Sequence, residues 1–423
     1  MEINQSYVLN KNKIINDPVY GFITIPSELI YDIIDHPFFQ RLRRIRQLGL
    51  TDMVYPGALH TRFHHALGAM HLMSITLSNL RSKGHEISDE EFEAAQLAIL
   101  LHDIGHGPFS HALEFTILNG VKHELLSLVI IDYLNKEFNG ALDLTLQIFT
   151  DKYPRRFFHD LVASQLDIDR LDYLSRDSFF TGVSEGTIGA DRIIKMLDIR
   201  DDRIVVEEKG IYSIENFLSA RRLMYWQVYL HKTAVSSEKM LIQIIRRVKE
   251  LSQAGVEVFA TPPLQVFLDH DINAKDIQKD PRFIEAYTQL DDYDIWAGIK
   301  LWQNHEDSVL SRLCKMIINR QLFRVRLSNE SFDRPQIFDR PQLDALRAKI
   351  QQQLKLSDEE IDYFYITGEI SNAAYMAKGQ HINIVTKQGI IRDIAEASDL
   401  PNIKAMSKIV RKYYLCWPKS VSL

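Results

Sequence analysis

The stretch at residues 97–111, LAILLHDIGHGPFSH, places metal-capable side chains at the end of an apolar run. His102 and Asp103 end the run, and two further histidines follow within nine residues. Nine of the 15 histidines of the chain fall between residues 60 and 123. Histidine is the commonest metal ligand and the usual acid–base group near neutral pH. The clustering therefore indicates a metal-dependent site and favours it over a helix cap or a simple ion pair.

The adjacent pair His102-Asp103 would offer one nitrogen and one oxygen ligand from a single helix end. A histidine from a neighbouring helix and a distant carboxylate would complete a His₂Asp₂ set. That mixture suits Mn, Fe, Zn, Ni or Mg and leaves positions open for water and substrate. His64 and His65 are both candidates for the second histidine, and spacing alone does not choose between them. Other histidines carry no supporting pattern and are expected at the surface or in the core, namely His60, His71 and His85.

The composition is that of a globular protein with a large core, with 46% hydrophobic and 25% charged residues among 423. A net charge of −6 and a pI near 6.2 argue against a general binder of nucleic acid or anionic membranes. Cys314 and Cys416 stand in no motif spacing, which argues against disulfides or a thiolate metal site and fits the cytoplasm. Residues 1–13 show no signal-peptide pattern, and no run approaches the roughly 20 apolar residues of a membrane span.

Helices dominate the prediction for the first part of the chain. Apolar periodicity and end signals predict helices at 36–50, 62–80, 88–103, 123–134 and 213–252. Ser88 and Glu91 form a capping box at the start of the third of these. Gly105 and Pro108 must end the same helix near Asp103.

The last third of the chain changes character. Residues 310–320 still favour a helix, but residues 322–328 alternate between apolar and polar side chains, which predicts a strand. Further strands are predicted at 362–370 and 380–393, and a closing helix at 400–415. We expect a mainly α protein with a large helical domain at 1–255, a helical connection at 256–309 and a smaller α+β region at 310–423.

Four stretches together narrow the interpretation: RFHHALG at 62–68, LLHDIGHGPFSH at 100–111, KHE at 122–124 and LDIDRLDYLSRD at 166–177. Their order, H…HD…D, resembles the HD-domain metal-dependent phosphohydrolases. NDPVYGFITIP, DHPFFQRLRRIRQLG and YPGALHTRFHHALG add a closer resemblance to the deoxynucleoside triphosphate (dNTP) triphosphohydrolase branch. The resemblance covers residues 16–250 and implies an HD-domain helical fold with an N-terminal regulatory segment, without a SAM domain.

The resemblance implies a set of metal ligands: His65, His102, Asp103 and Asp169. It favours His65 over His64, and it gives Asp167 and Asp172 weaker claims than Asp169. Hydrolysis at the α-phosphorus needs a nucleophilic water, and a bound metal lowers the pKa of water from 15.7 toward roughly 7.

The resemblance also implies the residues of the catalytic cleft. The acid–base candidates are His106, His111, His123 and Glu114, the last paired with His123. The phosphate-binding candidates are Arg62, Arg170 and Arg221, where Arg170 replaces a lysine and changes the donor geometry. The candidates for reading the deoxyribose are Gln47, Tyr173 and Asp177. The leaving 5′-oxygen needs a proton, and we favour His111 as its donor, with the His123–Glu114 pair as the other candidate.

A regulatory nucleotide site between subunits is implied at Asp35, Gln40, Arg43 and Lys232. An aspartate and an arginine there can read the edge of a guanine, while Lys232 would hold the activator's phosphates. Taken alone, Arg41, Arg43, Arg44 and Arg46 are more typical of a solvated helix face. Tyr225 departs from the pattern, since the eukaryotic enzymes have a cleft histidine there.

We therefore expect a cytoplasmic homo-oligomer, a tetramer or a dimer, that cleaves dNTPs to deoxynucleoside and inorganic triphosphate with a divalent metal. One alternative is an HD phosphohydrolase acting on another nucleotide. Another is a nucleotide-sensing or nucleic-acid-binding module with weak catalysis. The complete ligand set argues against an inactive site, and the acidic pI argues against nucleic acid as a partner.

Overall fold

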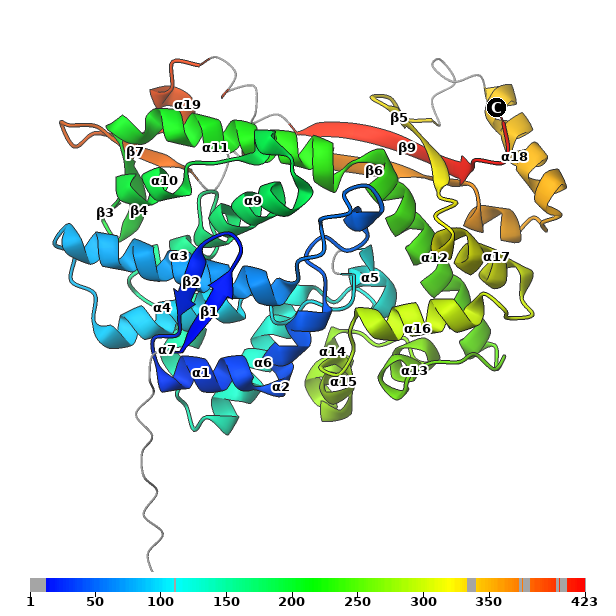
Figure 1. Ribbon diagram of the computed structural model, residues 1–423, viewed down its shortest axis with the longest axis horizontal. Helices are drawn as coiled ribbons and strands as arrows, with labels where there is room; N and C mark the ends of the chain where they lie inside the picture. Colours follow the sequence, from blue (N-terminus) through cyan, green and yellow to red (C-terminus); the bar gives the residue numbers. More distant parts are fainter. Residues whose placement is uncertain are drawn as a thin grey trace, which may run out of the picture.

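The computed structural model describes residues 13–109, 112–332, 340–372, 375, 381–400, 403 and 409–422. Helices make up the bulk of the part of the chain that the structure describes, and its strands form three small sheets (Figure 1). The expected fold class is confirmed, because the sheet-containing part from the last third joins a mainly α body. Among the described residues no helix is both long and apolar enough to cross a membrane.

The helices fall into two groups along the chain. Those before residue 255 are α1 Glu28–Asp35, α2 Pro37–Gln40, α3 Arg62–Ser82, α4 Asp89–Leu101, α5 Glu114–Ile117, α6 His123–Glu137, α7 Asp143–Phe149, α8 Phe157–Val162, α9 Ile168–Thr181, α10 Ala190–Met196, α11 Ile211–Met224 and α12 Lys232–Gln253. Those after it are α13 Pro262–Asp269, α14 Ala274–Lys279, α15 Pro281–Tyr287, α16 Asp292–Trp302, α17 Ser308–Ile318, α18 Arg340–Leu354 and α19 Ile394–Ala397.

The strands form three sheets. β1 Ile14–Asp17 and β2 Gly21–Thr24 make an antiparallel hairpin. The second sheet has the order β3-β4-β7-β8, with β3 Leu197–Arg200, β4 Arg203–Glu207, β7 Asn383–Val385 and β8 Ile391–Asp393. The third has the order β5-β9-β6, with β5 Phe323–Ser328, β6 Ile366–Asn372 and β9 Val410–Pro418. Since β4 pairs in parallel with β7, the C-terminal region completes a sheet that starts before residue 255.

Helix α3 packs against α4 and α9. Gly68 permits the contact with α9, because a Cβ there would lie 2.1 Å from Asp172 Oδ1 and from Arg176 Nη2. Gly105 plays the same part beyond α4, since its Cβ would lie 2.4 Å from the His123 carbonyl oxygen. These two close approaches bring the ends of α4, α6 and α9 together.

Helix α4 begins and ends as the sequence predicts. Ser88 Oγ accepts the Glu91 N–H, and Glu91 Oε2 accepts the Ser88 N–H, which completes the capping box. The helix ends at Leu101, so that His102 and the following residues leave the helix as a loop.

Two predicted helices are wrong in extent. In the segment 36–50, α2 is followed by a 3₁₀ turn at Arg41–Arg44 and then by extended backbone. The cause is long-range pairing, because the Arg62 N–H donates to the Ile45 carbonyl and the Gln47 N–H to the His60 carbonyl. The predicted helix 213–252 is interrupted by a π-helix at Tyr225–Tyr229, after which α12 starts anew.

The C-terminal elements agree in part with the prediction. The helix at 310–320 and the strand at 322–328 correspond to α17 and β5. The predicted strands 362–370 and 380–393 are shorter: a 3₁₀ turn precedes β6, and β7 and β8 form a hairpin. The closing helix at 400–415 is wrong where described, because residues from Val410 onward form β9 between β5 and β6; residues 401–402 and 404–408 lie outside the described residues.

Candidate active site

Two histidines and an aspartate converge where α3, α9 and the C-terminal end of α4 meet. Nε2 of His65 lies 3.1 Å from Asp169 Oδ1, and Nε2 of His102 lies 3.4 Å from the same oxygen. All three ligand atoms lie within 4.8 Å of one another. Both Nε2 atoms are buried and make no hydrogen bond of good geometry among the described residues. Buried polar atoms without hydrogen bonds are costly, so this convergence fits a bound cation.

The opposite nitrogen of each histidine is held by an acceptor. His65 Nδ1 lies 2.7 Å from Asp172 Oδ2, and His102 Nδ1 lies 2.6 Å from the Ile99 carbonyl oxygen. A carbonyl oxygen can only accept, so Nδ1 of His102 carries the proton and its Nε2 presents a lone pair. This is the usual outer arrangement of metal-binding histidines.

Asp103 lies at the edge of the same cluster. Its Oδ1 is 3.3 Å from His102 Nε2 and 3.4 Å from His106 Nε2, while its Oδ2 is 3.8 Å from His65 Nε2. Oδ2 also pairs with the guanidinium of Arg62. The four predicted ligands are therefore brought together, and a divalent ion would fit between their imidazole nitrogens and carboxylate oxygens.

The charges of the cluster also favour a cation. Burial alone would raise the pKa of Asp169, but the nearby imidazoles of His102 and His65 bring it below its usual range. Burial would lower the pKa of His65, but Asp169 and Asp172 raise it to about 10. The carboxylates thus attract positive charge at the point where the two histidines meet.

A cavity of about 430 Å³ opens beside the ligands. It is lined by Gln47, Leu48, Gly49, Thr51, Arg62, Asp103, His106, Phe109, Ala112, His123, Asp169, Arg170, Tyr173, Asp177, Tyr225, Tyr229, Leu230 and Glu238. Two of the three predicted phosphate-binding arginines and all three predicted sugar residues belong to this wall. The third arginine, Arg221, is buried and its Nη1 donates to Gln165 Oε1 at 3.3 Å, outside the lining.

Each of the two arginines of the wall lies near one carboxylate of the predicted ligand set. Arg62 is only 2% exposed and pairs with Asp103. Arg170 Nη1 lies 2.6 Å from Asp167 Oδ2 and 3.8 Å from Asp169 Oδ2. Asp167 thus caps α9 and holds Arg170, which leaves the ligand position to Asp169.

The predicted sugar residue Asp177 is held from two sides. Its Oδ1 lies 2.7 Å from His60 Nε2, and its Oδ2 accepts the hydroxyl of Tyr229 at 2.8 Å. His60 is fully buried and stacks on Phe180 with a ring distance of 4.5 Å. Because Tyr225 and Tyr229 both lie on the π-helix, that irregular turn places two tyrosines on the cavity wall. Such turns often occur at functional sites.

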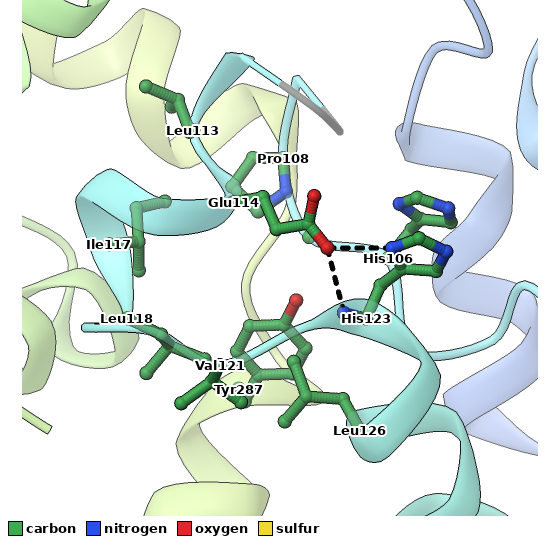
Figure 2. A pocket seen from close by; sticks show the side chains of 11 residues that line it. His106, Pro108, Leu113, Glu114, Ile117, Leu118, Val121, His123, Leu126 and Tyr287 are labelled. Atoms are coloured by element: carbon green, nitrogen blue, oxygen red, sulfur yellow. Dashed lines mark hydrogen bonds and ion pairs between the residues drawn. The ribbon is translucent and has the colours of Figure 1, made fainter. Parts of the chain in front are cut away.

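The acid–base candidates form a stacked pair with a carboxylate behind it. The rings of His106 and His123 lie 3.8 Å apart, nearly parallel. Figure 2 shows Glu114 reaching the ring and the backbone nitrogen of His123; its Oε1 is 2.7 Å from Nδ1 and 2.9 Å from N. Burial, and next the charge of Arg62, hold the pKa of His106 well below its usual value. His111, the favoured proton donor, lies outside the described residues.

The predicted regulatory residues are brought together only in part. Gln40 Oε1 accepts the Nε–H of Arg43 at 2.8 Å, and the Arg43 guanidinium lies 3.6 Å above the ring of Phe63. Asp35 is exposed at the end of α1, and Lys232 is exposed at the start of α12. In the part of the chain that the structure describes, no hydrogen bond or ion pair joins Lys232 to the other three.

Several residues that hold the site were not singled out from the sequence. Arg176 bonds Asp172 with Nε and Nη2, both at 3.0 Å, and Asp17 with Nη1 at 2.7 Å. His60, Tyr229 and Glu238 belong to the same group of omissions. A helical interpretation of 166–177 could have found Arg176, because its spacing from Asp172, already named as a weaker ligand candidate, places both on one face of α9.

The comparisons with known proteins agree with this geometry. The chain matches the HD domain family over residues 62–177 and the HD associated region over residues 188–275. An uncharacterized Bacillus subtilis protein, YwfO, is 32% identical over 425 residues, which cover 98% of this chain and 94% of that protein. The chain belongs to the HD-domain phosphohydrolases, enzymes that hydrolyse phosphate esters at a site for divalent metal ions.

Two further relatives define its neighbourhood within that family. The crystal structure of a phosphohydrolase from Bacteroides thetaiotaomicron has a TM-score of 0.91 and 56% sequence identity, and the match covers 96% of this chain and 100% of that chain. The deoxynucleoside triphosphate triphosphohydrolase SAMHD1 homolog of Dictyostelium discoideum is 34% identical over 249 residues, 54% of this chain. The match spans about half the length of that relative, 48%.

Proposed function

We propose that this protein hydrolyses deoxynucleoside triphosphates to deoxynucleoside and inorganic triphosphate. One observation supports the proposal above all: two of the proposed metal ligands, Asp103 and Asp169, line a single cavity of about 430 Å³ together with Arg62, Arg170 and Asp177. That volume lies within the range of small-molecule sites. The names of the SAMHD1 relatives point to the same substrate class.

The metal ligands in this proposal are His65, His102, Asp103 and Asp169. A divalent ion held there would neutralise phosphoryl charge and lower the pKa of a water molecule toward roughly 7. Mn, Fe, Mg, Ni and Zn all accept this mixture of nitrogen and oxygen donors.

The remaining residues orient the substrate and complete the reaction. Arg62 and Arg170 pair with the anionic triphosphate, a charge-assisted interaction, and Arg221 supports them from behind the wall. Gln47, Tyr173 and Asp177 contact the deoxyribose. Water forms a new bond to the α-phosphorus and releases a proton to the solvent, and the bond to the 5′-oxygen breaks. That oxygen takes a proton from His111 or from His123, which Glu114 and the stacked His106 hold in place.

The reaction is tested by its products. Purified protein is incubated with dGTP and Mn²⁺ or Mg²⁺, and the products are separated by anion exchange. Deoxyguanosine plus inorganic triphosphate supports the proposal. Deoxyguanosine diphosphate or inorganic pyrophosphate as a product identifies an HD phosphohydrolase of other specificity. Absence of turnover favours a nucleotide sensor. Asp169→Ala should remove both bound metal and turnover; a variant that keeps both would show that the ligand assignment is wrong.

We also propose that a nucleotide activator binds between subunits of a homo-oligomer at Asp35, Gln40, Arg43 and Lys232. The support is the polar pair Gln40–Arg43, in which Nε of Arg43 donates to Gln40 while the guanidinium stacks on Phe63. GTP or a dNTP should shift the protein toward a larger assembly in light scattering, and Arg43→Ala should remove the shift.

A further inference from the structure

Asp292 connects two segments of the active site from outside both matched family regions. It is the first residue of α16 and is 4% exposed. Its Oδ1 accepts the N–H of Phe109 at 2.8 Å, and its Oδ2 accepts the N–H of Arg46 at 2.9 Å. A single carboxylate therefore ties together two loops that are more than 60 residues apart in the sequence.

Both of these loops supply the wall of the substrate cavity. Gln47 follows Arg46 directly, and Phe109 lies in the loop that also carries His106. Phe109 has a φ of +52°, a left-handed conformation that a residue with a Cβ rarely adopts unless its surroundings hold it. Two groups of α16 do so here: Asp292 accepts the Phe109 N–H, and the Trp296 ring packs edge-on against the Phe109 ring at 6.0 Å.

Arg41 also connects the 102–109 loop with the residues just before α16, through side-chain hydrogen bonds. Its side chain is completely buried. Nη2 donates to the carbonyl oxygens of Ile104 and His106 at 2.8 and 3.0 Å, and Nη1 donates to those of Leu290 and Tyr287 at 3.0 and 3.3 Å. Arg41 therefore joins the loop after His102 to the turn before α16.

Tyr287 adds a direct contact from that turn. Its hydroxyl donates to the Gly105 carbonyl oxygen at 2.9 Å. Figure 2 shows the Tyr287 ring beside the chain that leads from His106 to His123. The carbonyl groups of Ile104, Gly105 and His106 thus receive hydrogen bonds from Arg41 or Tyr287 and not from a regular helix or sheet.

The chemistry of these ties argues against simple core packing. Burying a guanidinium and a carboxylate costs more desolvation free energy than burying apolar side chains of the same size. The gain lies in geometry, because charged groups with several bonds fix the direction of backbone groups in an irregular loop. Such groups are expected where a loop must keep one conformation.

We propose that Asp292 and Arg41 are positioning residues for the reaction, which hold the loop 102–109 and the segment 45–47 in one arrangement through the 287–292 turn. This arrangement keeps the metal-ligand end of the cavity aligned with Gln47. The catalytic effect rests on the proposed function, while the effect on loop conformation stands by itself.

The test compares Asp292→Asn with Asp291→Asn. The amide of Asp292→Asn keeps the shape of the side chain but offers one acceptor oxygen in place of two, so one of the two backbone N–H groups loses its partner. Asp291 caps the same helix by accepting the Tyr293 N–H at 2.9 Å and pairs with Arg44, so it controls for damage to α16. Asparagine is itself a good N-cap. Burial raises the pKa of Asp292 to about 6, so measurements at pH 8 keep the carboxylate ionised.

Hydrogen–deuterium exchange reports on the loops without any assay of activity. In Asp292→Asn, peptides covering 104–109 and 45–47 should exchange roughly tenfold faster or more, while exchange within α16 and the metal content stay unchanged. kcat/KM should fall by roughly tenfold to a hundredfold, the range expected when catalytic groups shift by about 1 Å. Tyr287→Phe, which removes one hydroxyl and keeps the ring, should show the same pattern more weakly.

Each outcome decides one of the two claims. Equal exchange in Asp292→Asn, Asp291→Asn and the wild type would overturn the positioning role, as would losses of activity that simply follow the melting temperature. Faster exchange in the two loops of Asp292→Asn, together with a wild-type enzyme that shows no dNTP turnover, would uphold the positioning role and refute the proposed function.

Discussion

His65 Nδ1 lies 2.7 Å from Asp172 Oδ2, and both side chains are completely buried. The bond directs Nε2 of His65 toward Asp169. Arg176 fixes Asp172 in turn and is itself paired with Asp17 in the N-terminal hairpin. The orientation of His65, a proposed metal ligand, therefore depends on a chain of buried charges that ends on β1.

Asp172→Asn should weaken metal binding by roughly 10- to 100-fold, because the partners of ligating histidines fix ring orientation and basicity. The measurement is the dissociation constant for Mn²⁺ by calorimetry, together with the metal retained after dialysis against a chelator. Asp198→Asn is the matched control, since Asp198 lies 2.6 Å from His85 Nε2, and neither residue is among the metal ligands. Equal affinities in all three proteins would show that the bond has no role in metal binding.

Tyr229→Phe tests whether Asp177 reads the sugar. Loss of the Tyr229 hydroxyl leaves His60 to hold the Asp177 carboxylate. The lost hydrogen bond is worth about 1 kcal/mol of free energy. kcat/KM for a dNTP should fall roughly fivefold, whereas that for the matching 2′,3′-dideoxynucleotide should change little, because it lacks the 3′-hydroxyl. Tyr225→Phe is the control on the same π-helix. An equal loss for both substrates would contradict the assignment.

The elements predicted well are those whose signals are local. The capping box Ser88–Glu91 and the apolar runs of α3 and α4 depend on neighbours within a few turns, so the sequence determines them. The helix predicted at 400–415 and the helix predicted at 36–50 failed for one reason. Strand β9 exists because β5 and β6 pair with it, and the extended backbone after Arg44 exists because residues 60–62 pair with it.

The site shows the same division. His102 and Asp103 follow from local spacing, and family resemblance supplied His65 and Asp169. Residues whose partners lie far away in the sequence were missed. The arginine-rich segment around Arg41 is typical of a solvated helix face, but Arg41 is completely buried. Its partners lie 63 to 249 positions away in the sequence. No periodicity indicates such partners, so only the folded structure identifies them.

Glu238 should give the candidate active site a pH dependence. It lines the cavity, and burial raises its pKa to about 7, which Lys239 offsets only in part. The carboxyl therefore becomes charged as the pH rises through 7 and then repels an anionic substrate. KM for a dNTP should rise roughly two- to fivefold more between pH 6 and 8 in the wild type than in Glu238→Gln at low salt.

The substrate itself also titrates over this pH range, but its titration affects the wild type and Glu238→Gln equally. The difference between the two pH profiles of KM therefore reports on Glu238. Glu257→Gln provides the control, because Glu257 is exposed and does not line the cavity. Parallel pH profiles of KM for the wild type and Glu238→Gln would show that Glu238 does not face the substrate.

Glu91 should stabilise the fold in a pH-dependent way. Burial alone would raise its pKa, but the Ser88 N–H, the Tyr153 hydroxyl and Arg155 together bring it below its usual value. A carboxyl with a lowered folded-state pKa contributes stability above its unfolded pKa of about 4.3, and the contribution disappears as the pH falls through the folded-state pKa.

Glu91→Gln should lower the free energy of unfolding by about 1–3 kcal/mol at pH 7, since charge-assisted hydrogen bonds are lost. The difference should shrink below about pH 4, as measured by urea denaturation at both pH values. Glu90→Gln, at an exposed position in the same helical turn, should change stability by less than about 0.5 kcal/mol at either pH. A Glu91→Gln deficit that is the same at pH 7 and pH 3 would mean that packing, and not charge, accounts for the contribution of this side chain.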